Sequence, residues 1–88
     1  MSELEKLKER LKSLPKDFSY NEAKTLLQKL GFEEINKGKT SGSRVKFQRH
    51  RVKEENILLH KPHPKKILKP YVVKQLLEDL KYFDDIEE

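Results

Sequence analysis

The chain of 88 residues contains no cysteine. This absence excludes a disulfide framework and metal sites built on thiolates, and it is typical of a reducing compartment such as the cytoplasm. Long apolar runs are also missing, since the leucines between Met1 and Leu14 alternate with charged residues. We therefore expect no signal peptide, no membrane-spanning helix and a cytoplasmic protein. Only 34% of the residues are hydrophobic, so the single domain has a small core.

Positive charge is concentrated in one segment of the chain. Residues 36–74 contain 12 lysines and arginines against the two acidic residues Glu54 and Glu55, a local charge of +10. The remaining residues carry 8 basic and 13 acidic groups, and all three histidines lie inside the basic segment. This polarisation favours a polyanionic partner such as RNA, because phosphates attract such a segment without base specificity.

Apolar residues recur at helical spacing in three segments. A first helix is expected from Ser2 to Ser13, with a leucine stripe that docks either on the domain or on a partner. A second helix begins after Ser19, which forms a capping box with Glu22, and it ends at Gly31. A third helix begins near Pro70. Its apolar stripe consists of Val73, Leu76, Leu77, Leu80 and Phe83. The acidic residues after it are expected to fray.

Three strands are expected between the second and third helices, at Phe32–Asn36, Ser43–Gln48 and Asn56–His60. The order helix, three antiparallel strands, helix predicts an α+β fold like that of a double-stranded-RNA-binding domain. Both helices then cover one face of the sheet, and the extra N-terminal helix precedes this unit. The expected boundaries are 1–17 for the N-terminal helix and linker, 18–84 for the domain, and 85–88 for an acidic tail.

The alternation of apolar residues also predicts how the second and third strands pair. If Val45 lies opposite Leu59 and Phe47 opposite Ile57, the apolar faces of the two strands coincide. The same antiparallel register places Arg44 opposite His60 on the face away from the helices. A slip of this register by two residues would keep the apolar residues on the same face of the sheet but would break the pairing of Arg44 with His60.

Several motifs, in this order, resemble the HicA family, the small mRNA interferase toxins of bacterial toxin–antitoxin pairs. They are Ala23-Lys24-Thr25-Leu26-Leu27 with Leu30-Gly31-Phe32, then Gly42-Ser43-Arg44-Val45-Lys46-Phe47, and His63-Pro64-Lys65-Lys66-Ile67-Leu68-Lys69-Pro70. The resemblance covers about Phe18 to Phe83. It implies an endoribonuclease that cleaves mRNA without a metal or other cofactor, and a HicB-type antitoxin protein that covers its basic face.

In that family a catalytic histidine directly follows the Gly-Ser pair, and the matching residue here is Arg44. A guanidinium stays protonated at neutral pH, so Arg44 cannot act as a general base. His60, opposite Arg44 in the expected register, is the candidate for a relocated base. Arg44 then binds or stabilises the phosphate while the ribose hydroxyl attacks the adjacent phosphorus.

Other polar residues of the basic segment are expected to contact RNA. They are Lys39, Ser43, Lys46, Lys61, His63, Lys65 and Lys66. His50, at an expected loop tip, is interpreted as a phosphate contact at most, and His63 also serves to shape the proline-rich connector. Phe47 and Tyr71 are assigned to the core and not to a base-stacking platform. The irregular spacing of the histidines disfavours a zinc site.

Two alternatives to a ribonuclease remain open from the sequence. The first is a non-catalytic RNA-binding module on the same fold, in which replacement of the histidine after Gly-Ser by Arg44 ended catalysis. The second is a protein-interaction adaptor that uses the leucine stripe of the N-terminal helix.

Overall fold

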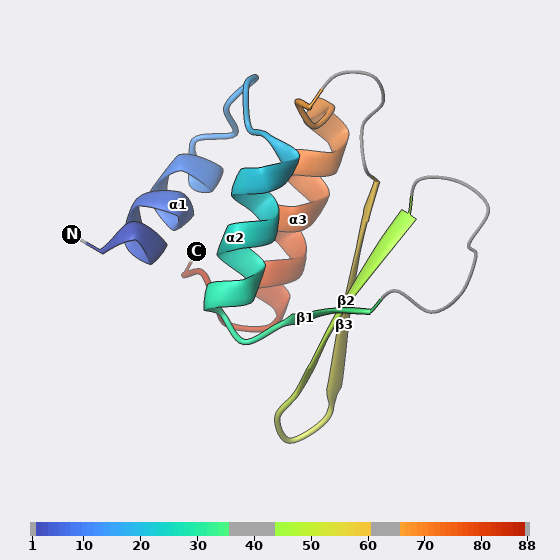
Figure 1. Ribbon diagram of the computed structural model, residues 1–88. Coiled ribbons are helices and arrows are strands. Elements are labelled where there is room, and N and C mark those ends of the chain that lie inside the picture. Colours follow the sequence, from blue (N-terminus) through green and yellow to red (C-terminus); the bar gives the residue numbers. More distant parts are fainter. Residues whose placement is uncertain (1, 36–43, 61–65, 88) are drawn as a thin grey trace.

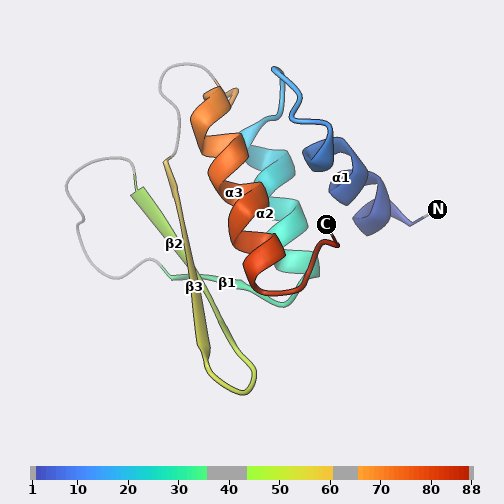
Figure 2. The same ribbon diagram turned by 180° about the vertical axis from the view of Figure 1, so that it is seen from behind.

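The computed structural model describes residues 2–35, 44–60 and 66–87 (Figure 1). Its elements are α1 (Glu3–Lys12), α2 (Tyr20–Lys29), β1 (Glu33–Ile35), β2 (Arg44–His50), β3 (Glu54–His60) and α3 (Pro70–Tyr82). The strands form one antiparallel sheet in the order β1-β2-β3. Helices α2 and α3 lie side by side on one face of this sheet, and α1 packs on their far side (Figures 1 and 2). The expected α+β fold of the double-stranded-RNA-binding type is confirmed.

The ends of α2 follow directly from local sequence. The Ser19 hydroxyl accepts a hydrogen bond from the backbone N–H of Glu22, whose carboxylate accepts one from the N–H of Ser19. This reciprocal capping satisfies two donors that the first helical turn leaves unpaired. At the other end Gly31 has φ +98°, and the N–H of Phe32 bonds to the carbonyl of Leu27 at 2.9 Å. Glycine adopts this left-handed conformation without a Cβ penalty, so the helix stops there.

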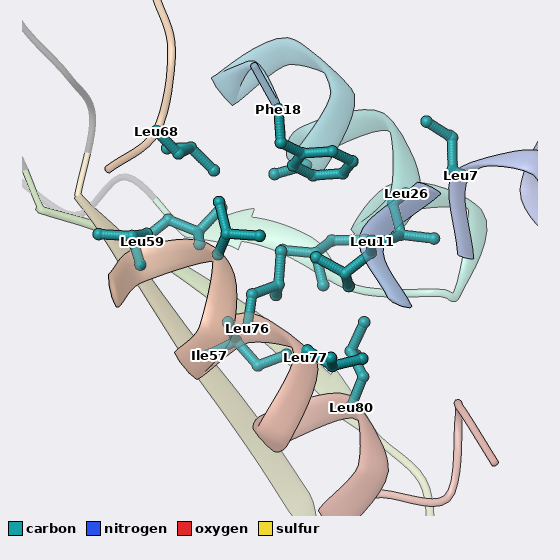
Figure 3. Close-up of a cluster of buried hydrophobic side chains, with 14 of the residues drawn as sticks. Leu7, Leu11, Phe18, Leu26, Ile57, Leu59, Leu68, Leu76, Leu77 and Leu80 are labelled. Carbon is teal, nitrogen blue, oxygen red and sulfur yellow. The ribbon is translucent and has the colours of Figure 1, made fainter. Parts of the chain in front are cut away.

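The core lies between the sheet and the helices. Phe47 of β2 and the alternate residues Ile57 and Leu59 of β3 are buried on the sheet face toward α2 and α3. Side chains from every layer converge there with Phe18 and Leu68, as Figure 3 shows. The labelled contributors are Leu7 and Leu11 of α1, Leu26 of α2, Ile57 and Leu59 of β3, and Leu76, Leu77 and Leu80 of α3.

Helix α1 is packed into this core. Leu11 is fully buried and Leu7 nearly so, whereas Leu14 lies past the helix end and is 46% exposed. An ionic contact reinforces the docking, because the guanidinium of Arg10 bonds to the carboxylate of Glu22 and, at 2.9 Å, to that of Asp17. The leucine stripe therefore docks on the chain's own helices.

The C-terminal residues differ from the expectation of a frayed tail. Ile86 is 4% exposed within the core cluster, and the N–H of Asp85 bonds to the carbonyl of Leu80 at 2.8 Å. Burial of Ile86 removes apolar surface from water and so helps to fold this segment back onto the domain.

Replacement of Leu11 by alanine is expected to destabilise the protein by about 2–5 kcal/mol, because it leaves a cavity at a fully buried position. The matched control is Leu14→Ala at a half-exposed position, which is expected to change stability by less than about 0.5 kcal/mol. Urea unfolding followed by circular dichroism measures both. Equal effects of the two substitutions would mean that α1 does not belong to the cooperative core.

Candidate functional site

Strands β2 and β3 pair in the expected register. Val45 lies opposite Leu59, Phe47 opposite Ile57, and Arg44 opposite His60. Both strands are longer at the hairpin end than expected, since β2 extends to His50 and β3 begins at Glu54, while β1 is shortened to Glu33–Ile35. These shifts of the strand ends leave the register unchanged, so His60 is the cross-strand neighbour of Arg44.

The sheet face turned away from the helices is named the open face. Because Phe47, Ile57 and Leu59 point into the core, the residues between them point the other way. Along β2 and β3 these open-face residues are Lys46, Gln48, His50, Glu54, Asn56, Leu58 and His60. His60 is exposed, Leu58 is 53% exposed, and Lys46 is half-buried opposite Leu58.

The two ends of the open face differ chemically. At the hairpin end, Gln48 donates to Asn56 at 3.2 Å, Asn56 donates to Glu54 at 3.0 Å, and the His50 ring lies 4.0 Å from the Glu54 carboxylate. The hydrogen bond from Asn56, and to a smaller extent the charge of Lys46, lowers the pKa of Glu54 although partial desolvation opposes this. This end is a self-contained polar cluster.

At the opposite end, the imidazole of His60 makes no hydrogen bond or ion pair with any residue that the structure describes. It stands next to the paired position of Arg44 and is accessible to solvent. About 20 Å separates the two ends, since Glu54 and His60 are six residue steps apart along an extended strand. His50 and His60 therefore do not belong to one site. In the described ranges no group of three His, Cys, Asp or Glu residues could hold a metal ion.

Other predicted contacts divide into two groups. Lys46 lies on the open face, and Lys66 is exposed just before α3, where its carbonyl accepts the N–H of Tyr20 at 2.9 Å. The remaining predicted contacts are outside the described residues: Lys39, Ser43, Lys61, His63 and Lys65.

Arg49, one of the arginines counted in the basic segment, has a structural role. It is only 6% exposed, and its guanidinium bonds to Glu55 at 2.7 Å, to both carboxylate oxygens of Asp85 and to the carbonyl of Leu30 at 2.9 Å. Its Cζ also lies 4.2 Å from the centre of the Phe32 ring. The signal for this burial is the alternation itself, since Arg49 continues the core-facing series of Val45 and Phe47.

Arg51 is also bound within the protein. Its guanidinium donates to both oxygens of Glu55, at 3.0 and 2.8 Å, and to the carbonyl of Phe83 at 2.8 Å. The hydrogen bond from Arg51, with a further one from Arg49, lowers the pKa of Glu55 against the opposing effect of desolvation. Burial by itself would lower the pKa of Arg49, but Asp85 and Glu55 raise it above its usual value. Both arginines are therefore bound to groups of the protein itself, Arg49 in the interior and Arg51 at the surface.

Of the two aromatic residues expected in the core, only one is buried. Phe47 is fully buried, as expected, but Tyr71 is 62% exposed and not part of the core. Its position in the first turn of α3 is one residue before the buried pair Val72 and Val73, which turn toward the sheet. The stripe of α3 contained the signal for this exposure, because two residues of helix turn by about 200° and Tyr71 precedes Val73 by two residues.

Comparison with known proteins agrees with this architecture. The model of the family described as "HicA toxin of bacterial toxin-antitoxin" matches residues 20–82, from the first residue of α2 to the last residue of α3. The match includes the whole sheet and excludes α1. Searches of curated proteins and of solved structures returned no significant match. In the described parts of the chain, no helix has the length and apolar character needed to cross a membrane.

The substitution Glu55→Gln is expected to lower the free energy of unfolding at pH 7 by about 1–3 kcal/mol, because it weakens charge-assisted bonds to Arg49 and Arg51. The folded-state pKa of Glu55 is depressed, so its stabilisation is present above the unfolded pKa of about 4.3 and is lost as the pH falls through the folded value.

The difference between wild type and Glu55→Gln in denaturant titrations should therefore be largest at neutral pH and shrink below about pH 4. Glu33→Gln, at an exposed position of β1, is the matched control and should differ little from wild type at any pH. A pH-independent difference for Glu55→Gln would contradict this ionic role.

Proposed function

The chain belongs to the HicA toxin family of bacterial toxin–antitoxin systems, and on this premise we propose that it is an endoribonuclease that binds and cleaves mRNA in the cytoplasm. A HicB-type antitoxin protein neutralises it in this proposal by covering the same basic face. The observation that carries the proposal is the pairing of Arg44 with His60 at one end of the open face. There an exposed imidazole stands beside the position that holds the catalytic residue in the family.

The proposed reaction uses the RNA's own hydroxyl as nucleophile. The His60 imidazole accepts the proton of a ribose 2′-hydroxyl, and the oxygen attacks the adjacent phosphorus. The bond from phosphorus to the 5′-oxygen then breaks, and this oxygen takes up a proton, leaving a 2′,3′-cyclic phosphate and a 5′-hydroxyl end. The guanidinium of Arg44 stabilises the negative charge on the non-bridging oxygens. Side chains supply proton transfer and charge stabilisation in this scheme, so it requires no metal ion.

Binding of the RNA backbone is assigned to polar residues of the basic segment. Lys46 on the open face and Lys66 before α3 belong to this group, and so do Lys39, Ser43, Lys61, His63 and Lys65 in the segments outside the described residues. Residues 18–84 form the functional domain in this proposal. Helix α1 packs on the far side of α2 and α3 and leaves the open face uncovered (Figures 1 and 2).

A second candidate function is a non-catalytic RNA-binding module. The observation that favours it is Arg44 itself, which replaces a histidine with a side chain that cannot accept a proton at neutral pH. The two functions share the RNA surface and differ only in whether His60 supplies the missing base.

His60→Ala is expected to reduce cleavage of single-stranded RNA at least about 100-fold and to abolish growth arrest on induction, since it removes the proposed general base. The fold should persist, because an exposed strand side chain contributes little to stability. His50→Ala, at the other end of the sheet, is the matched control and should cleave normally. Arg44→Ala should impair both binding and turnover.

Undiminished cleavage by folded His60→Ala protein would contradict the assignment of His60 as the general base. Binding of RNA by the wild-type protein without any cleavage would instead establish the non-catalytic module. Gel analysis of end-labelled RNA, with circular dichroism of each variant, separates these outcomes.

RNA affinity is expected to fall steeply with salt, each neutralised phosphate contributing about −0.7 to the slope of log K against log salt concentration. Lys46→Gln and Lys66→Gln should each make this slope shallower. Lys6→Gln and Lys8→Gln on α1 are the charge-matched controls and should leave it unchanged. Equal changes from both pairs would indicate diffuse attraction and no defined RNA face.

A further inference from the structure

Tyr71 presents an aromatic ring to solvent at the start of α3. The buried stripe of this helix consists of Val72, Val73, Leu76, Leu77 and Leu80, and Tyr71 stands outside it with 62% of its surface exposed. The ring therefore contributes little to the core, although it carries a large apolar face.

The charges near Tyr71 in the sequence are all positive. Lys66, Lys69 and Lys74 are exposed and form no ion pair with any residue that the structure describes. Lys74 lies one helical turn after Tyr71 on the same face of α3. No acidic residue occurs from position 61 to Gln75, and the first one after it is Glu78.

The opposite end of the same helix provides an internal contrast. Tyr82, the last residue of α3, is 79% exposed, but its neighbours in sequence include Glu78, Asp79 and Asp84. Lys81 directly precedes Tyr82, so the sequence around Tyr82 is of mixed charge, whereas the sequence around Tyr71 carries only positive charge. Both tyrosines are exposed, so the difference between them is the charge of the neighbouring residues.

Tyr71 also lies toward the same end of the molecule as His60. The end of β3 and the start of α3 point to the same side in both views (Figures 1 and 2). Only six peptide units join His60 to Lys66, which limits their separation to about 20 Å. A polynucleotide bound at His60 can therefore continue over the start of α3.

We propose that Tyr71 is a stacking platform for an unpaired base of single-stranded RNA, with Lys66, Lys69 and Lys74 binding the phosphates on either side. This inference rests on the proposed function, since RNA is the ligand in both. Every base has a flat π-face, so such a platform binds RNA with little sequence preference. The three exposed lysines favour the phosphates of RNA as the ligand beside Tyr71, and a contact with the HicB-type antitoxin is an outcome of the test.

The test uses a fluorescent single-stranded 2′-O-methyl RNA, which the proposed reaction cannot cleave because its nucleophile is blocked, and a second oligonucleotide of equal length with abasic sites. Tyr71→Ala is expected to weaken binding of the base-bearing oligonucleotide by about 5-fold or more, the range measured for loss of one stacked base. It should change binding of the abasic oligonucleotide by less than about 2-fold, because the lysines still contact the phosphates.

Two further variants sharpen the test. Tyr82→Ala is the matched control and should bind both oligonucleotides like wild type, whereas Tyr71→Phe keeps the aromatic face and should retain affinity. The chain has no tryptophan, so Tyr71→Trp introduces a single reporter whose fluorescence should be quenched by the base-bearing oligonucleotide and not by the abasic one.

Equal affinity of wild type and Tyr71→Ala for the base-bearing oligonucleotide would overturn the stacking role and leave the proposed function intact. An equal loss on both oligonucleotides, or an equal loss from Tyr82→Ala, would overturn it as well. If Tyr71→Ala bound RNA like wild type but bound a HicB-type protein more weakly, the stacking role would also be overturned. Failure of the wild-type protein to bind either oligonucleotide would overturn the proposed function, and this inference with it.

Discussion

The buried guanidinium of Arg49 joins parts of the chain that are far apart in the sequence. It bonds to Glu55 across the hairpin, to the carbonyl of Leu30 at the end of α2, and to Asp85 after α3. A buried charge is stable only when its donors are satisfied, so each partner must occupy its place. A two-residue slip between β2 and β3 would break the Arg49–Glu55 pair. The same contact thus selects the register that places Arg44 opposite His60.

This network also determines which positive charges are available to a ligand. Arg49 and Arg51 are held by Glu55 and by groups near the C-terminus, so they stabilise the hairpin end of the sheet. The other end presents the exposed His60 and, before α3, the exposed Lys66. The charge count of the sequence treats all these cations alike. The structure divides them into cations that form ion pairs within the protein and cations that form none with the described residues.

The hydrophobic core includes residues at both ends of the chain that lie outside the family match. The family match covers 20–82, yet Leu11 of α1 and Ile86 of the C-terminal segment are buried in the same core. These additions lie behind α2 and α3, away from the open face (Figures 1 and 2). The fold can therefore gain stabilising segments on its helical side without altering the sheet surface on which the proposed RNA chemistry depends.

The sequence by itself determined the helix starts, the α+β order and the pairing of β2 with β3. These features follow from local rules, namely the Ser19–Glu22 cap and a period-two alternation that sends Val45 and Phe47 to one face. Only the tertiary structure decided which groups bind the buried guanidinium of Arg49 and that Ile86 returns to the core. Each of these depends on contacts between distant segments, such as Arg49 with Asp85, and no local pattern encodes which distant group supplies the partner.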